Sequence, residues 1–333
     1  MGSTTPTHPP RLCRLLCAAA FTLLALVGSG CTLMRPYPPK INQEALDSIV
    51  TGALTRHGQG VTASVWIGGA DGEAWYSRDA DAWHGGASSV KTAYLIELFA
   101  AHEGHLDEPL PGTAEIVGVS DHPAVVHFDA QTQADIRRDI IGASVRRVGD
   151  MMIRGADVSN AVYNAAANVT TAHLGGPESL TQKIHARAPE FDGIAIRRHM
   201  LADRNVTGDN EVTAATLARV LQRIASGDVP GVSAETTEAM RDILHVGRRF
   251  RLGKEFFKSG SLNTDPIVRV RSGYFVKRGR VIVYAVMTEQ PDPGGLARDE
   301  AAQRLHETTV AMTDRLLHDV GRRVHGVHGF LPW

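Results

Sequence analysis

Strand-like segments occupy both ends of this 333-residue chain, and a long helical stretch separates them. Residues 61–67 alternate in polarity and are β-branched, and Gly68-Gly69 then turns the chain into a second run at 74–77, which predicts a hairpin. Three more strand-like runs follow near the other end, at 255–262, 267–276 and 281–288. This order predicts a mixed α/β fold in which the two ends build one sheet with helices on it, and the middle builds an all-helical part.

Helical periodicity fills most of the remaining chain. Asn42 can cap a first helix, in which Leu46, Val50 and Leu54 share one face. Further helices are expected at 88–103, 148–174, 178–187, 213–226 and 234–245, with a last amphipathic helix at 298–320 that ends at Gly321. The proline-containing stretch 107–147 is irregular in pattern and is assigned to no element.

The first 31 residues differ from the rest of the chain. Arg11 and Arg14 precede an apolar run at 15–27, which is too short and wrongly flanked for a membrane-spanning helix. Small residues then lead into Cys31 and resemble the bacterial lipoprotein cleavage box, with Gly28 in place of the usual aliphatic residue. The resemblance implies lipidation of Cys31, export, and anchoring in the cell membrane toward the envelope exterior or the periplasm. An ordinary cleaved signal peptide and a retained membrane anchor are the alternatives.

The whole chain is expected to divide into a lipoprotein signal peptide at 1–31, a proline-rich linker at 32–41, one domain at 42–322 and a polar tail at 323–333. All three cysteines lie in the leader, which excludes a disulfide or a cysteine-based metal site in the domain. The formal net charge of -1 offers no basic excess for nucleic acid. No metal or cofactor is expected.

The tetrad Ser88-Ser89-Val90-Lys91 opens a strongly helical run. Ser at position i and Lys at i+3 lie on the same face of a helix, so the amine and the hydroxyl can meet. A serine hydroxyl is a poor nucleophile until a base takes its proton, and lysine can be that base when burial or a nearby cation lowers its pKa. The helix N-terminus adds N–H groups where an oxyanion would form. The plainer interpretation is that Ser88 only caps the helix.

A second motif, Lys258-Ser259-Gly260, lies inside the strand expected at 255–262. Its glycine would let another segment or a ligand approach the strand closely. The alternative is a surface strand with a solvated lysine.

Together these motifs, in this order and on these elements, resemble the serine β-lactamase and penicillin-binding-protein family, and most of all its class A branch. The resemblance covers about residues 43–320. Asn164-Ala165-Ala166-Ala167-Asn168, followed by a glycine-rich turn at 173–177, looks like the family's S-D-N-x-A-A-N helix and the turn after it. The resemblance implies an antiparallel sheet with flanking helices plus an all-helical subdomain, and no cofactor.

The resemblance also implies a role for each matching residue. Ser88 would attack a lactam or peptide carbonyl with Lys91 as the base, and Lys258 would lower the pKa of Lys91 and attract a substrate carboxylate. The backbone N–H groups of Ser88 and Ser261 would form the oxyanion hole. Substrate binding would fall to Asn164, Ser259, Gly260, Ser261, Tyr163 and Arg269, with Arg271 as an alternative to Arg269. Both arginines equally fit the solvent face of a strand.

Two positions depart from the family pattern. Val162 stands where the family has the serine of S-D-N, which relays a proton to the leaving nitrogen. Tyr163 and Ser159 are poorly placed substitutes, because one residue turns a helix by about 100°. The stretch 197–202 contains no acid where class A enzymes carry the glutamate that activates the deacylating water.

The expected function is acylation of Ser88 by a β-lactam or a D-Ala-D-Ala-type cell-wall peptide, followed by slow deacylation. The alternative is a catalytically degenerate lipoprotein of the same fold that binds a ligand or partner at the cell surface. The intact Ser88, Lys91 and Lys258 favour the enzyme, whereas Val162 and the missing loop acid favour the binding protein. A purely structural envelope lipoprotein would require both motifs to be coincidences.

Overall fold

The computed structural model describes residues 39–58, 60–249 and 251–325. From Lys40 onward these residues belong to one compact unit. The expected lipidation site Cys31, the signal-peptide boundary and most of the linker and tail lie outside the described residues. Within the described ranges, no helix is both long enough and apolar enough to cross a bilayer.

One antiparallel sheet brings the two ends of this unit together, in the strand order β2-β1-β9-β8-β7-β6. Its strands are β1 (Thr62–Gly68), β2 (Ala74–Arg78), β6 (His245–Arg249), β7 (Gly253–Leu262), β8 (Ile267–Lys277) and β9 (Arg280–Gln290). β1 pairs with β9 along its whole length, from Thr62 opposite Glu289 to Gly68 opposite Val283. The expected hairpin and single sheet are confirmed. The edge strand β6 is not predictable from the sequence, because its residues are mostly polar and show no alternation.

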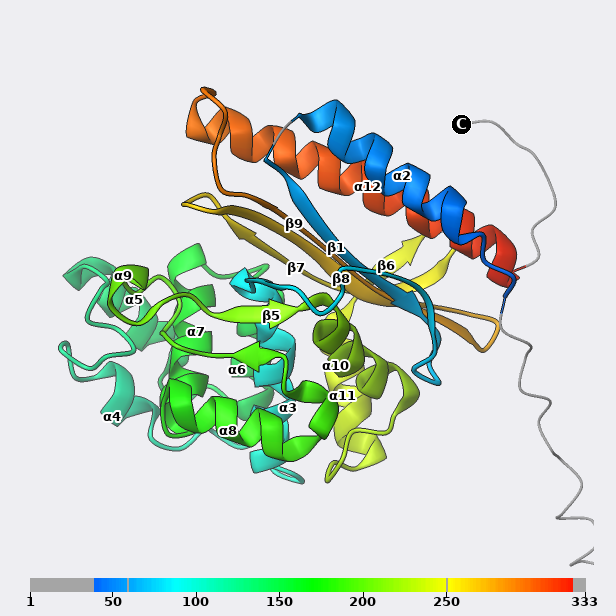
Figure 1. Ribbon diagram of the computed structural model, residues 1–333. Coiled ribbons are helices and arrows are strands. Elements are labelled where there is room, and N and C mark those ends of the chain that lie inside the picture. Colours follow the sequence, from blue (N-terminus) through cyan, green and yellow to red (C-terminus); the bar gives the residue numbers. More distant parts are fainter. Residues whose placement is uncertain (1–38, 59, 250, 326–333) are drawn as a thin grey trace, which may run out of the picture. The chain divides into compact units, whose positions relative to one another are not determined.

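Two helices from opposite ends of the unit, α2 (Gln43–His57) and α12 (Arg298–His325), lie side by side on one face of the sheet (Figure 1). Asn42 caps α2 as expected. The expected end of the last helix at Gly321 is wrong, because α12 continues past it. A Cβ at Gly321 would lie 2.4 Å from Leu252 Cδ2, so this glycine permits close packing against the segment before β7.

The opposite side of the sheet carries the helical part of the unit (Figure 1). Its longer helices are α3 (Lys91–Ala101), α5 (Ala130–Ile140), α6 (Val145–Ile153), α7 (Asn160–His173), α8 (Pro177–Arg187), α10 (Ala214–Ser226) and α11 (Ala234–Leu244). Shorter elements are α4 (Thr113–Val117), α9 (Arg204–Thr207), the 3₁₀ turns η1 (Ala87–Val90) and η2 (Pro189–Phe191), and a small sheet of β3 (Trp83–Gly85), β5 (Glu211–Thr213) and β4 (Ile194–Ala195).

The helical part differs from the expectation in two places. The stretch 107–147, which the sequence leaves unassigned, contains α4, α5 and the start of α6. The helical pattern expected at 148–174 divides into α6 and α7, because Ser159 caps a new helix by accepting a hydrogen bond from Val162 N at 3.2 Å. The polar cap at Ser159 therefore divides a continuous hydrophobic pattern into two helices.

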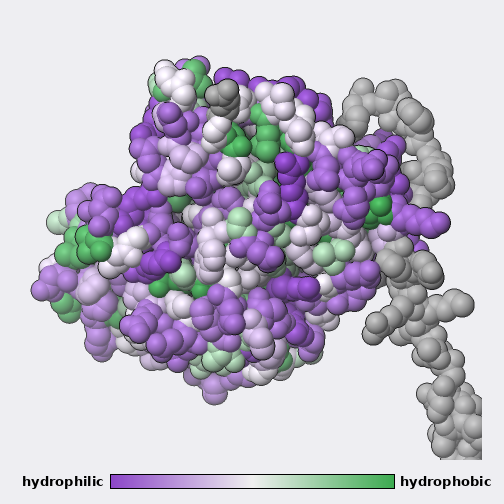
Figure 2. Space-filling model, in the orientation of Figure 1, coloured by the Kyte–Doolittle hydropathy of each residue, from purple (hydrophilic) through white to green (hydrophobic). Residues whose placement is uncertain are grey.

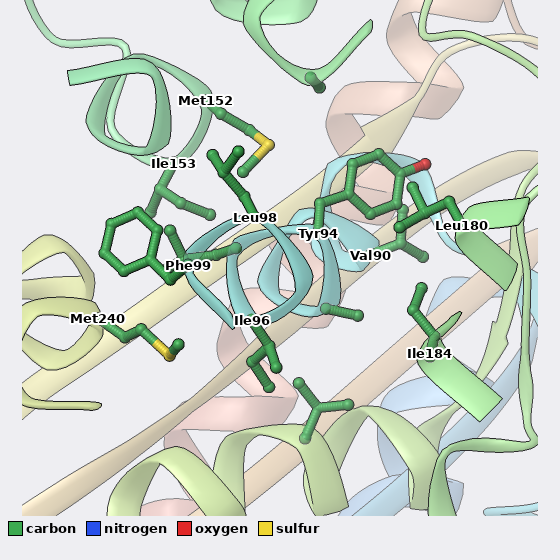
Figure 3. Packing of buried hydrophobic residues seen from close by; sticks show 14 of the residues in the cluster. Val90, Tyr94, Ile96, Leu98, Phe99, Met152, Ile153, Leu180, Ile184 and Met240 are labelled. Carbon is green, nitrogen blue, oxygen red and sulfur yellow. The ribbon is translucent and has the colours of Figure 1, made fainter. Parts of the chain in front are cut away.

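The helix α3 is enclosed by the rest of the helical part. Figure 3 shows apolar side chains around it, among them Met152 of α6, Ile184 of α8 and Met240 of α11. Every residue from Lys91 to Phe99 is buried, as expected for a helix with neighbours on all faces. Its one buried acid, Glu97, accepts two hydrogen bonds from Arg187, at 2.7 and 2.8 Å. This packing fixes the position of Ser88, which lies in the turn η1 that leads into α3.

Hydrophilic residues predominate on the face of the unit that Figure 2 displays, and hydrophobic residues form only small groups among the coloured atoms. Large apolar side chains that are more than half exposed include Leu201, Val206 and Val246. Two of them, Leu201 and Val246, lie at the mouths of pockets described below.

Candidate active site

Ser88 lies in a tight turn between the small sheet and α3. The preceding residue, Ala87, has a φ of 46°, a left-handed conformation that costs a non-glycine residue about 1 kcal/mol. Gly86 N donates to Asn210 O at 2.7 Å, and Ser89 Oγ donates to Gly86 O at 2.6 Å. These contacts hold the turn in a strained shape, of the kind that gathers at functional sites. Ser88 itself is half-buried.

The strand β7 runs directly beside this turn. A Cβ on Gly260 would lie 2.9 Å from Ser89 N and 3.0 Å from Ala87 Cβ, so the approach requires glycine. The same strand brings the exposed Ser259 and Ser261 to the pocket that Ser88 lines. The two motifs, far apart in the sequence, therefore meet.

Lys91 is fully buried, three residues after Ser88. Its Nζ donates to Asn164 Oδ1 at 3.0 Å and to the backbone oxygen of Tyr163 at 3.4 Å. Burial, and then the charge of Lys258, lowers the pKa of Lys91 well below its usual value. A neutral amine with its lone pair is thereby favoured next to Ser88.

Lys258 is only 6% exposed and also faces the helical part. Its Nζ donates to Ile153 O and to Tyr163 Oη, each at 2.6 Å. Burial lowers the pKa of Lys258 to about 7. The group therefore changes charge near neutral pH.

Tyr163 contacts both lysines and Ser88. Its ring centre lies 3.3 Å from Lys91 Nζ and 4.7 Å from Lys258 Nζ, within cation–π range. Its hydroxyl shares a hydrogen bond with Ser88 while it accepts from Lys258. Burial raises the pKa of Tyr163, so the phenol is the dominant form. The hydroxyl thus connects Ser88 to Lys258, although Tyr163 lies one residue after the position of the family's serine.

Two neighbours explain how Tyr163 reaches this position. Gly155, with a φ of 58°, would place a Cβ 2.6 Å from Tyr163 Cδ2, so its missing side chain makes room for the ring. Val162, which occupies the family's serine position, is buried in the hydrophobic core and does not face the pocket. Ser159 is engaged as the cap of α7.

The loop that covers the pocket is held by Asn168. Its Oδ1 accepts from Met200 N at 2.5 Å, and its Nδ2 donates to Met200 O at 3.1 Å and to Ala124 O at 3.0 Å. Met200 and Leu201 line the pocket. No acid lies between 197 and 202, as the sequence indicates.

One acid, Asp209, does line the pocket, but two arginines engage it. Arg198 Nε donates to Asp209 Oδ1 at 2.9 Å, and Arg204 Nη2 lies 2.7 Å from Asp209 Oδ2. An arginine thus engages each carboxylate oxygen of Asp209, and these contacts close the loop.

The structure does not bring Arg269 to the pocket, which corrects the expectation from the sequence. Its guanidinium donates to the backbone oxygens of Leu262, Val268 and Ala302, at 2.8 to 2.9 Å, so it ties β8 to α12 on the far face of the sheet. Arg271, two residues on, stacks over the ring of Phe257 at 5.1 Å. Alternation along a strand predicts two faces but not which one meets the site.

The expected residues that do come together line a pocket of ≈ 320 Å³. Ser88, Tyr163, Asn164, Ser259, Gly260 and Ser261 are among its walls, and Lys91 and Lys258 contact Tyr163 from behind. Within the described ranges, no group of three or more His, Cys, Asp or Glu side chains is placed to hold a metal ion. The arrangement offers a hydroxyl, a neutral amine, a phenol and a cation, which is sufficient for acyl transfer through a serine ester.

This fold and this set of side chains define the class of serine hydrolase-like proteins with the β-lactamase fold. Residues 44–312 match the beta-lactamase enzyme family, and the chain belongs to that family. A comparison with curated protein sequences found no match.

Solved structures with the same fold are distant in sequence. A β-lactamase from Sphaerobacter thermophilus DSM 20745 is 19% identical with a TM-score of 0.60, covering 84% of this chain and 98% of that one. PBP-A is 18% identical with a TM-score of 0.57, covering 85% and 98%. A class A β-lactamase representative from Bacteroides cellulosilyticus DSM 14838 is 13% identical with a TM-score of 0.59, covering 83% and 99%. At these identities the likeness shows the fold alone.

Proposed function

We propose that the protein is a serine hydrolase that is acylated at Ser88 by a β-lactam or a D-Ala-D-Ala-type cell-wall peptide and deacylates slowly. The observation that carries the proposal is the contact of the Tyr163 hydroxyl with both Ser88 and Lys258, above a fully buried Lys91. A purely structural protein would have no need to bury two lysines with lowered pKa values around one serine.

Acylation begins with removal of the Ser88 proton. Lys91 is the base, because its lowered pKa favours the neutral amine, and Asn164 Oδ1 fixes the amine by accepting one hydrogen bond. Ser88 Oγ then bonds to the substrate carbonyl carbon. The backbone N–H groups of Ser88 and Ser261 stabilise the developing oxyanion, and the close approach at Gly260 allows them to converge.

Collapse of the tetrahedral intermediate requires a proton on the leaving nitrogen. Tyr163 supplies it, since its hydroxyl contacts Ser88 and its raised pKa keeps the proton on the phenol until transfer. Lys258 donates to the same oxygen and stabilises any phenolate that forms. Tyr163 thus takes the relay role that Val162 cannot perform.

Deacylation lacks an equivalent base. Met200 is fixed by Asn168 at the pocket wall, the neighbouring loop residues carry no acid, and Asp209 is bound by two arginines. A mutant of one structural neighbour, PBP-A, is recorded as an acyl-enzyme complex with penicillin G. A long-lived acyl-enzyme is therefore the expected state of this protein with a β-lactam.

The missing loop acid also favours a second candidate, a protein of this fold that binds a ligand or partner at the cell surface without turnover. Mixing the full chain with a chromogenic cephalosporin separates the two. The hydrolase gives a rapid colour burst of about one equivalent per enzyme and then a slow phase, as expected when acylation outruns deacylation. Neither a burst nor any consumption of the cephalosporin would favour the binding protein.

We also propose that the leader makes the protein a membrane-anchored lipoprotein through Cys31. In a bacterial host, Cys31→Ser is expected to abolish incorporation of labelled fatty acid, whereas Cys17→Ser, in the same leader, retains it. Equal labelling of both variants would contradict the anchor.

A further inference from the structure

A second pocket, of ≈ 560 Å³, adjoins the Ser88 pocket and shares Tyr163 and Ser259 with it, whereas Lys258 lines only the second pocket. Tyr163 and Ser259 form the wall between the two spaces. Ser88 lines only the first pocket. A molecule bonded to Ser88 can therefore extend into the second pocket by passing Tyr163 and Ser259, and it then meets Lys258.

The walls of the second pocket are largely apolar. Ile153 from the end of α6 and Ile243 from the end of α11 are each 5% exposed, and Val246 of β6 is 55% exposed at the mouth. The strand β6 pairs only with the first half of β7, from Arg249 opposite Gly253 to His245 opposite Phe256. Beyond that point β7 has no partner strand on this side, which leaves the space open.

The described lining residues of the second pocket include two basic side chains, Lys258 and Arg154, and no acid. The guanidinium of Arg154 already has protein partners, because its Nε donates to Ile243 O at 2.8 Å and its Nη1 lies 3.5 Å from Asp150 Oδ1. Lys258 donates two of its three hydrogens to Ile153 O and Tyr163 Oη. The third hydrogen and the exposed Ser259 hydroxyl together suit a carboxylate.

The position of the proton donor determines which part of a substrate enters this pocket. The group that protonates a leaving atom must lie within hydrogen-bond reach of it. In the proposed reaction that group is the Tyr163 hydroxyl, which lies on the wall between the two pockets. The leaving group therefore departs toward the second pocket, while the acyl group remains in the first.

We propose that the second pocket is the leaving-group subsite, and that it selects a leaving group with a carboxylate and a large apolar side chain, branched or aromatic. This inference rests on the proposed acylation of Ser88. A methyl group would leave most of ≈ 560 Å³ unfilled, whereas an aromatic side chain would contact Ile243 and Val246. The carboxylate would meet Lys258 and Ser259.

The step balances without any further reactant. The Ser88 Oγ–carbonyl carbon bond forms and the carbon–nitrogen bond of the substrate breaks. The Ser88 proton passes to Lys91, the leaving nitrogen takes the Tyr163 proton, and Lys258 restores the phenol through its hydrogen bond to Tyr163 Oη, so that one lysine gains the proton that the other gives up. The product is the acyl-enzyme and a free amino acid with a bulky side chain.

Two thioesters with the same acyl group test the subsite in the full chain. One releases sulfanylacetate and the other 2-sulfanyl-3-phenylpropanoate, so both leaving groups carry a carboxylate and only the second carries a benzyl group. The leaving group departs during acylation, so the rate of the first turnover is sufficient for the comparison. Loss of thioester absorbance measures that rate. We expect acylation to be at least about tenfold faster per unit substrate concentration with the benzyl compound.

Two exposed valines provide a matched pair of variants. Val246→Asn places a polar group at the pocket mouth and is expected to lower the benzyl preference severalfold. Val206→Asn makes the same change on α9, at a site that lines neither pocket and is 77% exposed, and is expected to leave the preference unchanged.

The outcomes separate this inference from the proposed function. Equal acylation rates with the two thioesters, or an unchanged preference in Val246→Asn, would overturn the subsite and leave acylation at Ser88 intact. Failure of the wild-type chain to consume either thioester, with no adduct on Ser88, would overturn the proposed function and the subsite with it.

Discussion

At the scale of single residues, Tyr163 connects the parts of the site. Gly155 makes room for its ring, the Nζ atoms of two lysines face that ring, and its hydroxyl contacts Ser88. The sequence identifies Ser88, Lys91 and Lys258 because their chemistry depends on short spacings. It names Tyr163 as a substrate-binding residue but gives it a poor position for the proton relay, because a helical-register argument counts Cα positions and leaves out the length of the tyrosine side chain.

Tyr163→Phe tests the relay with little change in shape. The variant keeps the ring between the lysines and removes only the hydroxyl, so acylation by a penicillin is expected to slow by about a hundredfold, as for loss of a general acid. Stopped-flow measurement of the acylation rate checks this. Tyr76→Phe is the control, since Tyr76 donates to Asp47 at 2.8 Å far from the pocket. An acylation rate unchanged in Tyr163→Phe would remove Tyr163 from the mechanism.

At the scale of elements, the sequence predicts the sheet, the hairpin and most helices, because their hydrophobic periods are strong. It does not predict β6, whose pairing depends on a neighbour and not on its own pattern. It assigns Arg269 to the wrong face, since alternation in β8 gives no indication of which face meets the helical part. For the loop around Met200, the sequence shows that an acid is missing. Only the structure shows that Asn168 binds the backbone of this loop.

Met200→Glu tests whether this loop limits deacylation. Asn168 binds the backbone of Met200 on both sides, so a new side chain can enter without moving the loop. A glutamate there is expected to accelerate hydrolysis of the penicilloyl-enzyme by about a hundredfold, the low side of what a positioned base contributes. Met200→Gln has the same size without the base. If Met200→Gln accelerated hydrolysis as much as Met200→Glu, the effect would not come from a base.

At the scale of the whole molecule, the site exists only where the sheet meets the helical part. Its walls come from η1, α7, β7 and the loop before β5, so packing of distant segments determines its geometry. No local pattern predicts the second pocket, because α6, α11 and β6 reach it from different directions. The same packing buries His199 under the pocket loop. Its pKa falls to about 4, chiefly through burial and then through His127 and His122.

His199 makes the fold sensitive to acid. Between its usual pKa of 6.5 and about 4, the unfolded chain binds a proton that the folded chain rejects, so the free energy of unfolding decreases as pH falls across this window. The loss attributable to His199 is on the order of 3 kcal/mol at most. Urea unfolding at both ends of the window should show a smaller loss in His199→Gln. His105→Gln, at a side chain 63% exposed, should keep the wild-type loss, and an equal loss in all three proteins would contradict the assignment.

The central claim, that Ser88 is the nucleophile, is tested most directly by intact-mass spectrometry of the full chain after incubation with a penicillin. The account predicts a stable mass increase of one penicilloyl group, mapped to the peptide that contains Ser88. Ser88→Ala should lose the adduct, whereas Ser89→Ala should keep it, because Ser89 Oγ is directed away to Gly86 O. Retention of the adduct in Ser88→Ala would contradict the claim.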